Sequence, residues 1–107
     1  MKKGELVRRP VLWAPFAEAD LFNIWRTVAS DSLASTADRT LKEIHRAACL
    51  LGGYPEFGRL RDDVRIGLRS VLSQRCVIFY RVKPKAIEIV RVLDERRDVD
   101  AIFSYEA

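Results

Sequence analysis

The stretch VIFYRVKPKAIEIVRVLDERRD, residues 77–98, decides the fold. It belongs to two apolar runs, residues 76–82 and 86–93, which Lys83-Pro84-Lys85 connects. Runs rich in Val, Ile, Phe and Tyr are typical of strands, and so short a connection permits only a hairpin. Apolar residues occupy both alternating positions of each run, so both faces of the predicted hairpin carry large apolar groups.

The chain upstream of this hairpin predicts a strand, two helices, a loop and another strand. Residues 6–13 indicate a strand that Pro10 confines to a sheet edge, and residues 65–72 indicate the strand before the hairpin. One helix is expected from Pro15 to about residue 29, and the next from a cap at Asp31 or Ser32 to a left-handed glycine stop at residues 52–53. Residues 52–63 predict a loop.

Apolar residues recur at helical spacing in both predicted helices. The two stripes are Ala17, Leu21, Ile24, Trp25 and Val28, and then Ala37, Leu41, Ile44, Ala48 and Leu51. Asp20 is assigned to the polar face of the first helix. We therefore predict a single α+β domain over residues 1–107: an N-terminal strand, a helical hairpin, and three antiparallel strands, with the helices on one sheet face. The other apolar face needs cover from the tail, as a short helix or an extended segment, or from a second subunit or a partner.

The composition limits the classes of protein to which this chain can belong. The chain has 107 residues, 49% hydrophobic and 32% charged, which suits one globular domain. No apolar run approaches the ~20 residues that cross a bilayer, and no signal core follows the basic N-terminus, so a cytoplasmic protein is expected. Cys49 and Cys76 are interpreted as reduced packing thiols, and no cofactor or metal site is expected.

The excess of basic residues lies mostly in arginine, and the formal net charge is +4. Such a surface anticipates an acidic partner, either RNA or a polypeptide. Arg81 and Arg91 stand among apolar strand residues, so each should have a carboxylate or carbonyl partner; Glu88 and Asp98 are the internal candidates. A second basic patch consists of Lys2, Lys3, Arg8 and Arg9.

Six segments in order resemble the ParE/RelE superfamily of toxins from bacterial type II toxin–antitoxin modules. WAPFAEADLFNIW resembles the family's first helix and STADRTLKEI the start of its second; YPEFGR resembles the following loop. The strongest stretch comprises Arg69, the run Ile78-Phe79-Tyr80-Arg81-Val82, the run that begins at Ile87, and Arg97-Asp98. The IFYRV hairpin with its closing arginine looks more like the ParE branch.

The resemblance implies a toxin that inhibits DNA gyrase by binding and that a cognate, ParD-like antitoxin neutralises in a hetero-oligomer. Under this interpretation Arg97, Arg96 and Arg69 are candidates for contact with the target. The candidates for contact with the antitoxin are Arg81, Arg91, Trp25 and Phe79. No cofactor, metal or membrane is implied, and no catalytic residue is assigned.

Two alternatives stay open: a RelE-like, ribosome-dependent mRNA endoribonuclease, and a relative that has lost its toxicity. The nuclease would need groups that move protons, with arginines on the phosphate at one patch of strand ends. This chain has Asp94 and Glu95 where many relatives carry His and Gly, and two carboxylates repel phosphate. His45 is expected on a helix surface and Tyr80 in the core.

Overall fold

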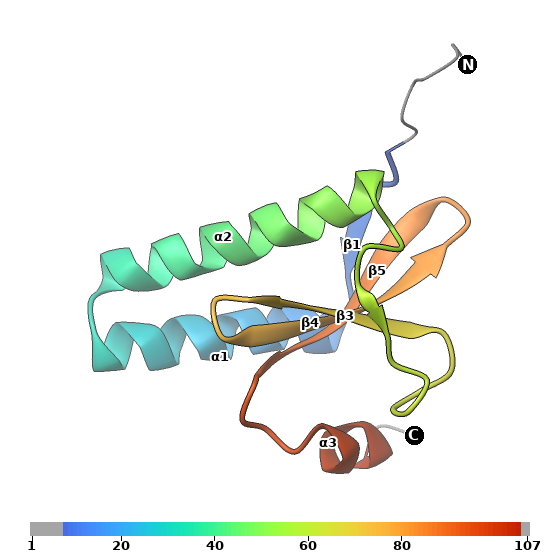
Figure 1. Ribbon diagram of the computed structural model, residues 1–107. Coiled ribbons are helices and arrows are strands. Elements are labelled where there is room, and N and C mark those ends of the chain that lie inside the picture. Colours follow the sequence, from blue (N-terminus) through green and yellow to red (C-terminus); the bar gives the residue numbers. More distant parts are fainter. Residues whose placement is uncertain (1–7, 106–107) are drawn as a thin grey trace.

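The computed structural model describes residues 8–105 of the chain. The elements are β1 (Val11–Trp13), α1 (Pro15–Asp31), α2 (Ala34–Gly53), β2 (Arg59–Leu60), β3 (Leu68–Ser73), β4 (Cys76–Lys83), β5 (Ala86–Asp94) and α3 (Val99–Tyr105). The strands form one sheet in the order β1-β5-β4-β3-β2. β1 runs parallel to β5, and the other neighbours are antiparallel (Figure 1). The predicted α+β class is confirmed.

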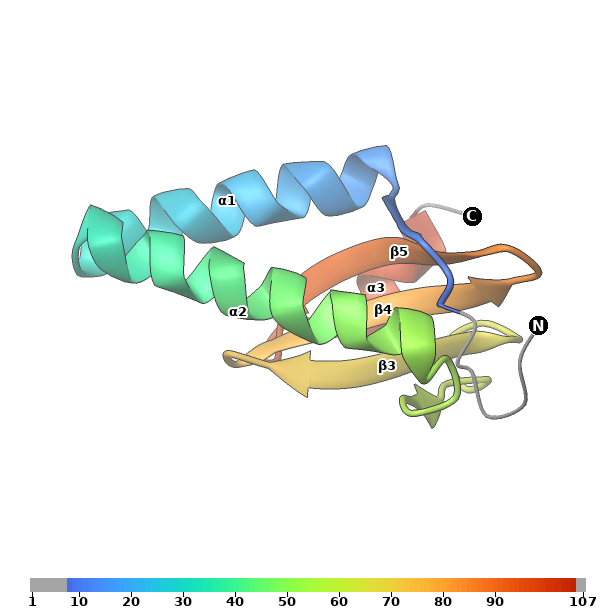
Figure 2. The ribbon, with the colours of Figure 1, turned by 90° about the horizontal axis from the view of Figure 1, so that it is seen from above.

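The helical hairpin lies on one face of the sheet, as predicted (Figures 1 and 2). Its apolar stripes pack on the side chains of β4 and β5 in a first core. The buried members of this core are Ala17, Leu21, Ile44, Ala48, Leu51, Cys76, Ile78, Tyr80, Ile87, Ile89 and Val92. Burial of this apolar surface is the main force that holds the helices to the sheet.

The helix ends differ from the prediction. α1 extends to Asp31, and α2 begins after Leu33, which makes no side-chain cap hydrogen bond, so neither Asp31 nor Ser32 caps it. α2 does end at Gly53, but Gly52 has no left-handed φ. A Cβ on Gly52 would lie 2.4 Å from the carbonyl oxygen of Arg9, whose N–H donates to the Gly52 oxygen at 2.9 Å. Glycine is needed there for this close approach.

The strand boundaries also shift. β3 begins at Leu68 because residues 61–68 form a turn, in which Arg61 N–H donates to the Leu68 oxygen and Asp62 accepts the N–H of Gly67. The short strand β2 lies inside the predicted loop. β1 is described from Val11, and residues 6 and 7 of the predicted first strand lie outside the described residues.

A β-bulge shifts the register of the β4–β5 pair. Phe79 is opposite Arg91, whereas Tyr80 is opposite Ile89, so Val90 is the extra residue. A bulge places two residues of one strand against one of its neighbour. As a result Ile89 and Val92 both join the first core, while Val90 packs on the opposite face.

The tail covers much of the second sheet face. α3 lies on the side opposite α1 and α2 (Figure 1). It brings Phe103 into a second core with Leu68, Phe79 and Leu93, and the ring centroids of Phe79 and Phe103 are 5.1 Å apart. Of the predicted ways to cover this face, the structure adopts the short closing helix.

Candidate protein-binding surfaces

An arginine-rich cleft lies where β5 ends. The turn at Gln74 and Arg75 has positive φ at both residues, 53° and 63°, which closes β3 and β4 with two residues. It brings Arg75 beside the end of β5, where its oxygen accepts the N–H of Glu95 at 2.9 Å. The cleft of about 340 Å³ is lined by charged residues of both signs and by polar residues of α1, namely Arg75, Arg96, Arg97, Asp94, Asp20, Asp31, Asn23 and Thr27.

Asp94 holds one of these arginines. Its carboxylate accepts the Nε–H of Arg96 at 2.9 Å, an Nη–H at 3.1 Å and the backbone N–H at 2.9 Å. The side-chain hydrogen bond from Arg96, more than any other contact, lowers the pKa of Asp94 to about 2. Asp94 is therefore ionised at neutral pH and a weak proton acceptor. The side chain of Arg96 is 84% exposed, and Arg97 is exposed beside it.

The groups that could move a proton are engaged elsewhere. The Tyr80 hydroxyl donates to the Pro55 oxygen and accepts the N–H of Gly58, both at 2.8 Å, and burial raises its pKa. Tyr80 is fully buried, which confirms its predicted core position. His45 is exposed on α2, with its ring 4.7 Å from that of Trp13, and so has the predicted surface position.

The arginines do not form the single patch of strand ends that the nuclease interpretation required. Arg69, on β3, donates to the oxygens of Glu56 and Gly58 and so fixes the loop before β2. Arg81 donates to the oxygen of Ile66 at 3.1 Å, which is a carbonyl partner of the predicted kind. Neither shares the cleft with Arg97.

Arg91 pairs with a carboxylate that the sequence interpretation did not propose. Its Nε and one Nη each donate to Asp20 on α1 at 2.7 Å, and the guanidinium carbon lies 5.3 Å from the ring centroid of Phe16. The candidates were wrong: Glu88 lies 3.9 Å from Lys83, and Asp98 accepts the N–H of Ala101 in α3. Asp20 was assigned to a polar face, although residues 17, 20 and 24 share one helix face at i, i+3 and i+7 spacing.

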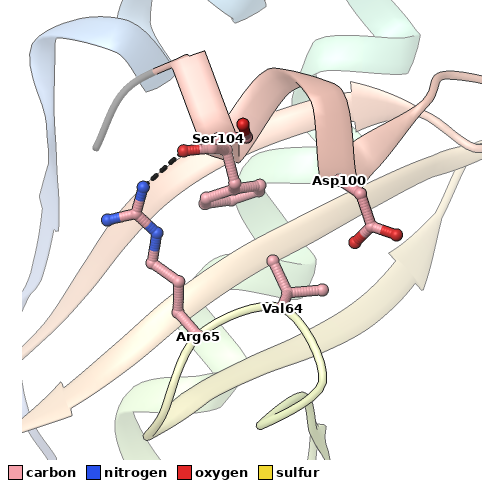
Figure 3. Close-up of a pocket in the computed structure, with 5 residues that line it drawn as sticks. Val64, Arg65, Asp100 and Ser104 are labelled. Atoms are coloured by element: carbon pink, nitrogen blue, oxygen red, sulfur yellow. Dashed lines mark hydrogen bonds between the residues drawn. The ribbon is translucent and has the colours of Figure 1, made fainter.

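Phe79 is fully buried, which corrects its prediction as an antitoxin contact. α3 covers it, and Arg65 fixes α3 by a hydrogen bond to the Phe103 oxygen and by lying over that ring at 5.6 Å (Figure 3). A partner therefore does not reach Phe79 in this conformation. Trp25 is half-buried, and its Nε1 donates to Asp38 at 2.8 Å, which ties α1 to α2.

An apolar groove lies between the end of α2 and the edge of the sheet. It has a volume of about 290 Å³, and its lining residues are Ala47, Leu50, Leu51, Tyr54, Phe57, Val71 and Leu72. Leu50 is 53% exposed, Phe57 74% and Leu72 60%. An exposed apolar surface of this kind is a candidate protein-binding site. Sequence reasoning missed it, although Leu50 and Tyr54 fall outside the predicted helix stripe.

The remaining sequence predictions concern thiols, metals and membranes. Cys76 is buried as expected, whereas Cys49 is exposed and not a packing thiol. Among residues 8–105 there is no group of three or more metal-ligating side chains, and no helix there is long and apolar enough to cross a membrane. Arg9 donates to the Lys83 oxygen; Lys2 and Lys3 of the second basic patch lie outside the described residues.

Known proteins resemble this chain over most of its length. Residues 11–99 match the family model described as ParE toxin of type II toxin-antitoxin system, parDE. Toxin ParE1 of Mycobacterium tuberculosis is 34% identical over 90 residues, which cover 83% of this chain and 92% of the relative. Toxin ParE3 of Caulobacter vibrioides is 30% identical over 99 residues, 92% of this chain and 93% of the relative.

A solved structure shares the fold. A chain of a structure described as "Chromosomal ParDE TA system from P. aeruginosa" superimposes with a TM-score of 0.72 at 22% identity, over 81% of this chain and 96% of that one. The order of elements, the helix hairpin on one sheet face and the sequence matches agree. The chain belongs to the ParE toxin family of type II toxin–antitoxin systems.

Proposed function

We propose that the protein inhibits DNA gyrase by binding to it in the cytoplasm, and that a cognate ParD-like antitoxin neutralises it in a hetero-oligomer. Family membership supports this proposal. The ionised, hydrogen-bonded carboxylate of Asp94 is the observation that favours binding over catalysis. Many relatives carry His at this position, but here Arg96 holds a carboxylate whose pKa is about 2. Such a group does not serve as a general base at neutral pH.

Arg97 is our first candidate for the contact with gyrase, with Arg96 and Arg75 beside it. Exposed guanidinium groups in one cleft suit a carboxylate-bearing protein surface, which they bind by paired hydrogen bonds. Arg96 already shares its guanidinium with Asp94, so Arg97 has more of its hydrogen-bonding capacity for a partner. Arg69, which holds the loop before β2, is a structural residue in our proposal rather than a target contact.

The antitoxin contacts are revised in the same way. Arg81 and Trp25 retain partly exposed side chains and stay candidates. Arg91, which is 12% exposed and bound to Asp20, and Phe79, which is buried, serve the fold in this proposal. An antitoxin then needs other apolar anchors on the toxin.

Two assays test the proposed target. The purified protein should inhibit supercoiling by gyrase and cause gyrase–DNA cleavage complexes to accumulate, and it should leave ribosome-bound mRNA intact. Codon-phased cuts in the message would instead establish the nuclease. Failure to arrest growth on expression, with neither activity in vitro, would indicate a relative that has lost its toxicity.

A substitution pair tests the proposed contact. Arg97→Gln should weaken gyrase inhibition by at least ten-fold, because it removes a charge-assisted contact of ~1.5 to 3 kcal/mol. Arg39→Gln, an exposed arginine on α2, is the matched control and should change inhibition less than two-fold. Equal loss in both variants would mean that net charge, not the cleft, determines binding.

A further inference from the structure

The outer edge of β3 ends in a segment without a neighbouring strand in the described part of the chain. β2 pairs only with Arg69 and Ser70, whereas β3 continues to Ser73. Because the turn has two residues, Ser73 and Cys76 form the last hydrogen-bonded pair of the β3–β4 hairpin. The peptide groups of Leu72 therefore point away from β4, in the same direction as the Leu68 oxygen that accepts Arg61 N–H at 2.7 Å.

The opposite edge of the sheet is closed. β1 pairs with β5 only from Ile87 to Ile89, but farther along β5 the N–H of Val92 donates to the carboxylate of Asp20 at 2.9 Å. α1 thus protects the edge where β1 ends. Proteins commonly block exposed strand edges because an edge is a template for another strand. The segment Val71–Ser73 has no such block, and it borders the apolar groove.

The geometry points to strand addition at this place. We propose that an extended segment of the cognate antitoxin pairs with β3 at Leu72 and places an apolar side chain in the groove between α2 and β3. This inference rests on the proposed function, which supplies the antitoxin. Backbone hydrogen bonds to the edge provide affinity in this mode of recognition, and side-chain pockets beside the edge provide specificity. α2 runs above β3 in Figure 2 and forms the wall of the groove.

Charge indicates the composition of the segment. The free end of β3 lies between two exposed arginines: Arg59, which is opposite Ser70, and Arg75, which follows in the turn. An antitoxin segment with acidic residues on both sides of its apolar anchor would match them. A second copy of this chain would not, because two-fold antiparallel pairing at Leu72 brings Arg75 of one copy toward the end of β3 that lies beside Arg59 in the other, and like charges repel.

The test uses the purified cognate antitoxin, with its affinity for toxin variants measured by calorimetry. Leu72→Pro removes the outward N–H and the side chain, while the β3–β4 ladder does not use that N–H. Leu72→Ala removes the side chain only. We expect Leu72→Pro to weaken binding at least ten-fold more than Leu72→Ala does, and hydrogen exchange at Leu72 in the wild-type complex to slow at least ten-fold. Equal affinities of the two variants, or unchanged exchange, would overturn strand addition.

A second pair of variants tests the groove even if the proline variant misfolds. Phe57→Lys should weaken antitoxin binding at least ten-fold, whereas Ile66→Lys, 86% exposed and outside the groove, should change it less than two-fold. Gyrase inhibition is measured separately. If the wild type does not inhibit gyrase, the proposed target fails, but the antitoxin affinities still decide this inference. Concentration-dependent dimers of the toxin alone that Phe57→Lys abolishes would assign the groove to a second copy and overturn it.

Discussion

Asp20 on α1 and Arg91 on β5 form a two-fold hydrogen-bonded ion pair, with both N···O distances 2.7 Å. The side chains are 9% and 12% exposed, and the same carboxylate accepts the N–H of Val92. One carboxylate thus joins the helical hairpin to the last strand and closes an edge of the sheet. Among the described residues Asp20 is the only charged residue that is buried, and Arg91 is half-buried.

Loss of this carboxylate should destabilise the fold. Asp20→Asn keeps the shape and one acceptor but removes the negative charge from this buried, hydrogen-bonded ion pair. We expect a loss of roughly 3 kcal/mol in the free energy of unfolding, measured with urea. Glu43→Gln, which removes the exposed pair with Arg46, should cost less than about 1 kcal/mol. Comparable losses in both variants would show that the burial of the first pair is unimportant.

The Tyr80 hydroxyl should fix the loop beside the groove. Tyr80→Phe leaves the N–H of Gly58 and the oxygen of Pro55 without their partner, at a cost of about 1 to 3 kcal/mol. Amide exchange at residues 55–58 should accelerate more than exchange in α1. Tyr54→Phe is the control, because that ring is exposed, and its unfolding free energy should stay near that of the wild type.

The helix α3 should shield the second core from solvent. Phe103→Ala removes a buried ring that contacts Phe79, so unfolding should become easier by roughly 3 kcal/mol. The variant should also bind a dye that reports exposed apolar surface, since Phe79 and Leu93 lose their cover. Ser104→Ala, on the exposed side of α3, should do neither. Unchanged dye binding by Phe103→Ala would mean that other residues cover this face.

The two thiols should differ in reactivity and in their effect on alkaline stability. Burial, more than the nearby carboxylates, raises the pKa of Cys76 from 9.0 to about 11, whereas Cys49 is exposed. One thiol equivalent should react rapidly with a disulfide reagent at pH 8, and Cys49→Ala should abolish that phase. A fast phase that survives Cys49→Ala would refute the assignment.

The same burial predicts the direction of the pH dependence. In the window from about pH 9 to 11 the unfolded thiol loses its proton and the folded one keeps it, so stability is complete below pH 9 and falls as pH rises, by up to ~1.4 kcal/mol per unit. Because the pKa of Tyr80 is also raised, the contribution of Cys76 is the difference in slope between wild type and Cys76→Ala. Parallel slopes would contradict it.

The local patterns were enough to predict the architecture. Pro15 opens α1, the apolar stripes face the sheet, and a short connection closes the hairpin, because each depends on neighbours in sequence. That connection is Pro84-Lys85, since Lys83 belongs to β4 and pairs with Ala86. The bulge at Val90 and the burial of Phe79 beneath α3 could not be predicted from the sequence, because they depend on contacts between distant segments. Asp20 shows the same limit: it was assigned to the polar face of its helix, and only the fold reveals its pairing with Arg91.

The surfaces were harder to predict than the fold. Arg97 and Arg96 were named as candidates for contact with the target, yet Arg75 joins them only through a turn with two left-handed residues. The groove was not predicted because its residues come from separate elements. Leu50 lies outside the predicted apolar stripe of α2, and Leu72 lies near the end of β3. Such surfaces are defined by what the fold leaves uncovered.

The parallel pairing of β1 with β5 has a consequence for synthesis. Val11 lies beside Ile87, so the first strand finds its place only after the last one exists. Contacts so distant along a chain form late, so the hairpin of β3 and β4 can pair before β1 has its neighbour. The five-stranded sheet is therefore complete only when nearly all of the chain has been synthesised.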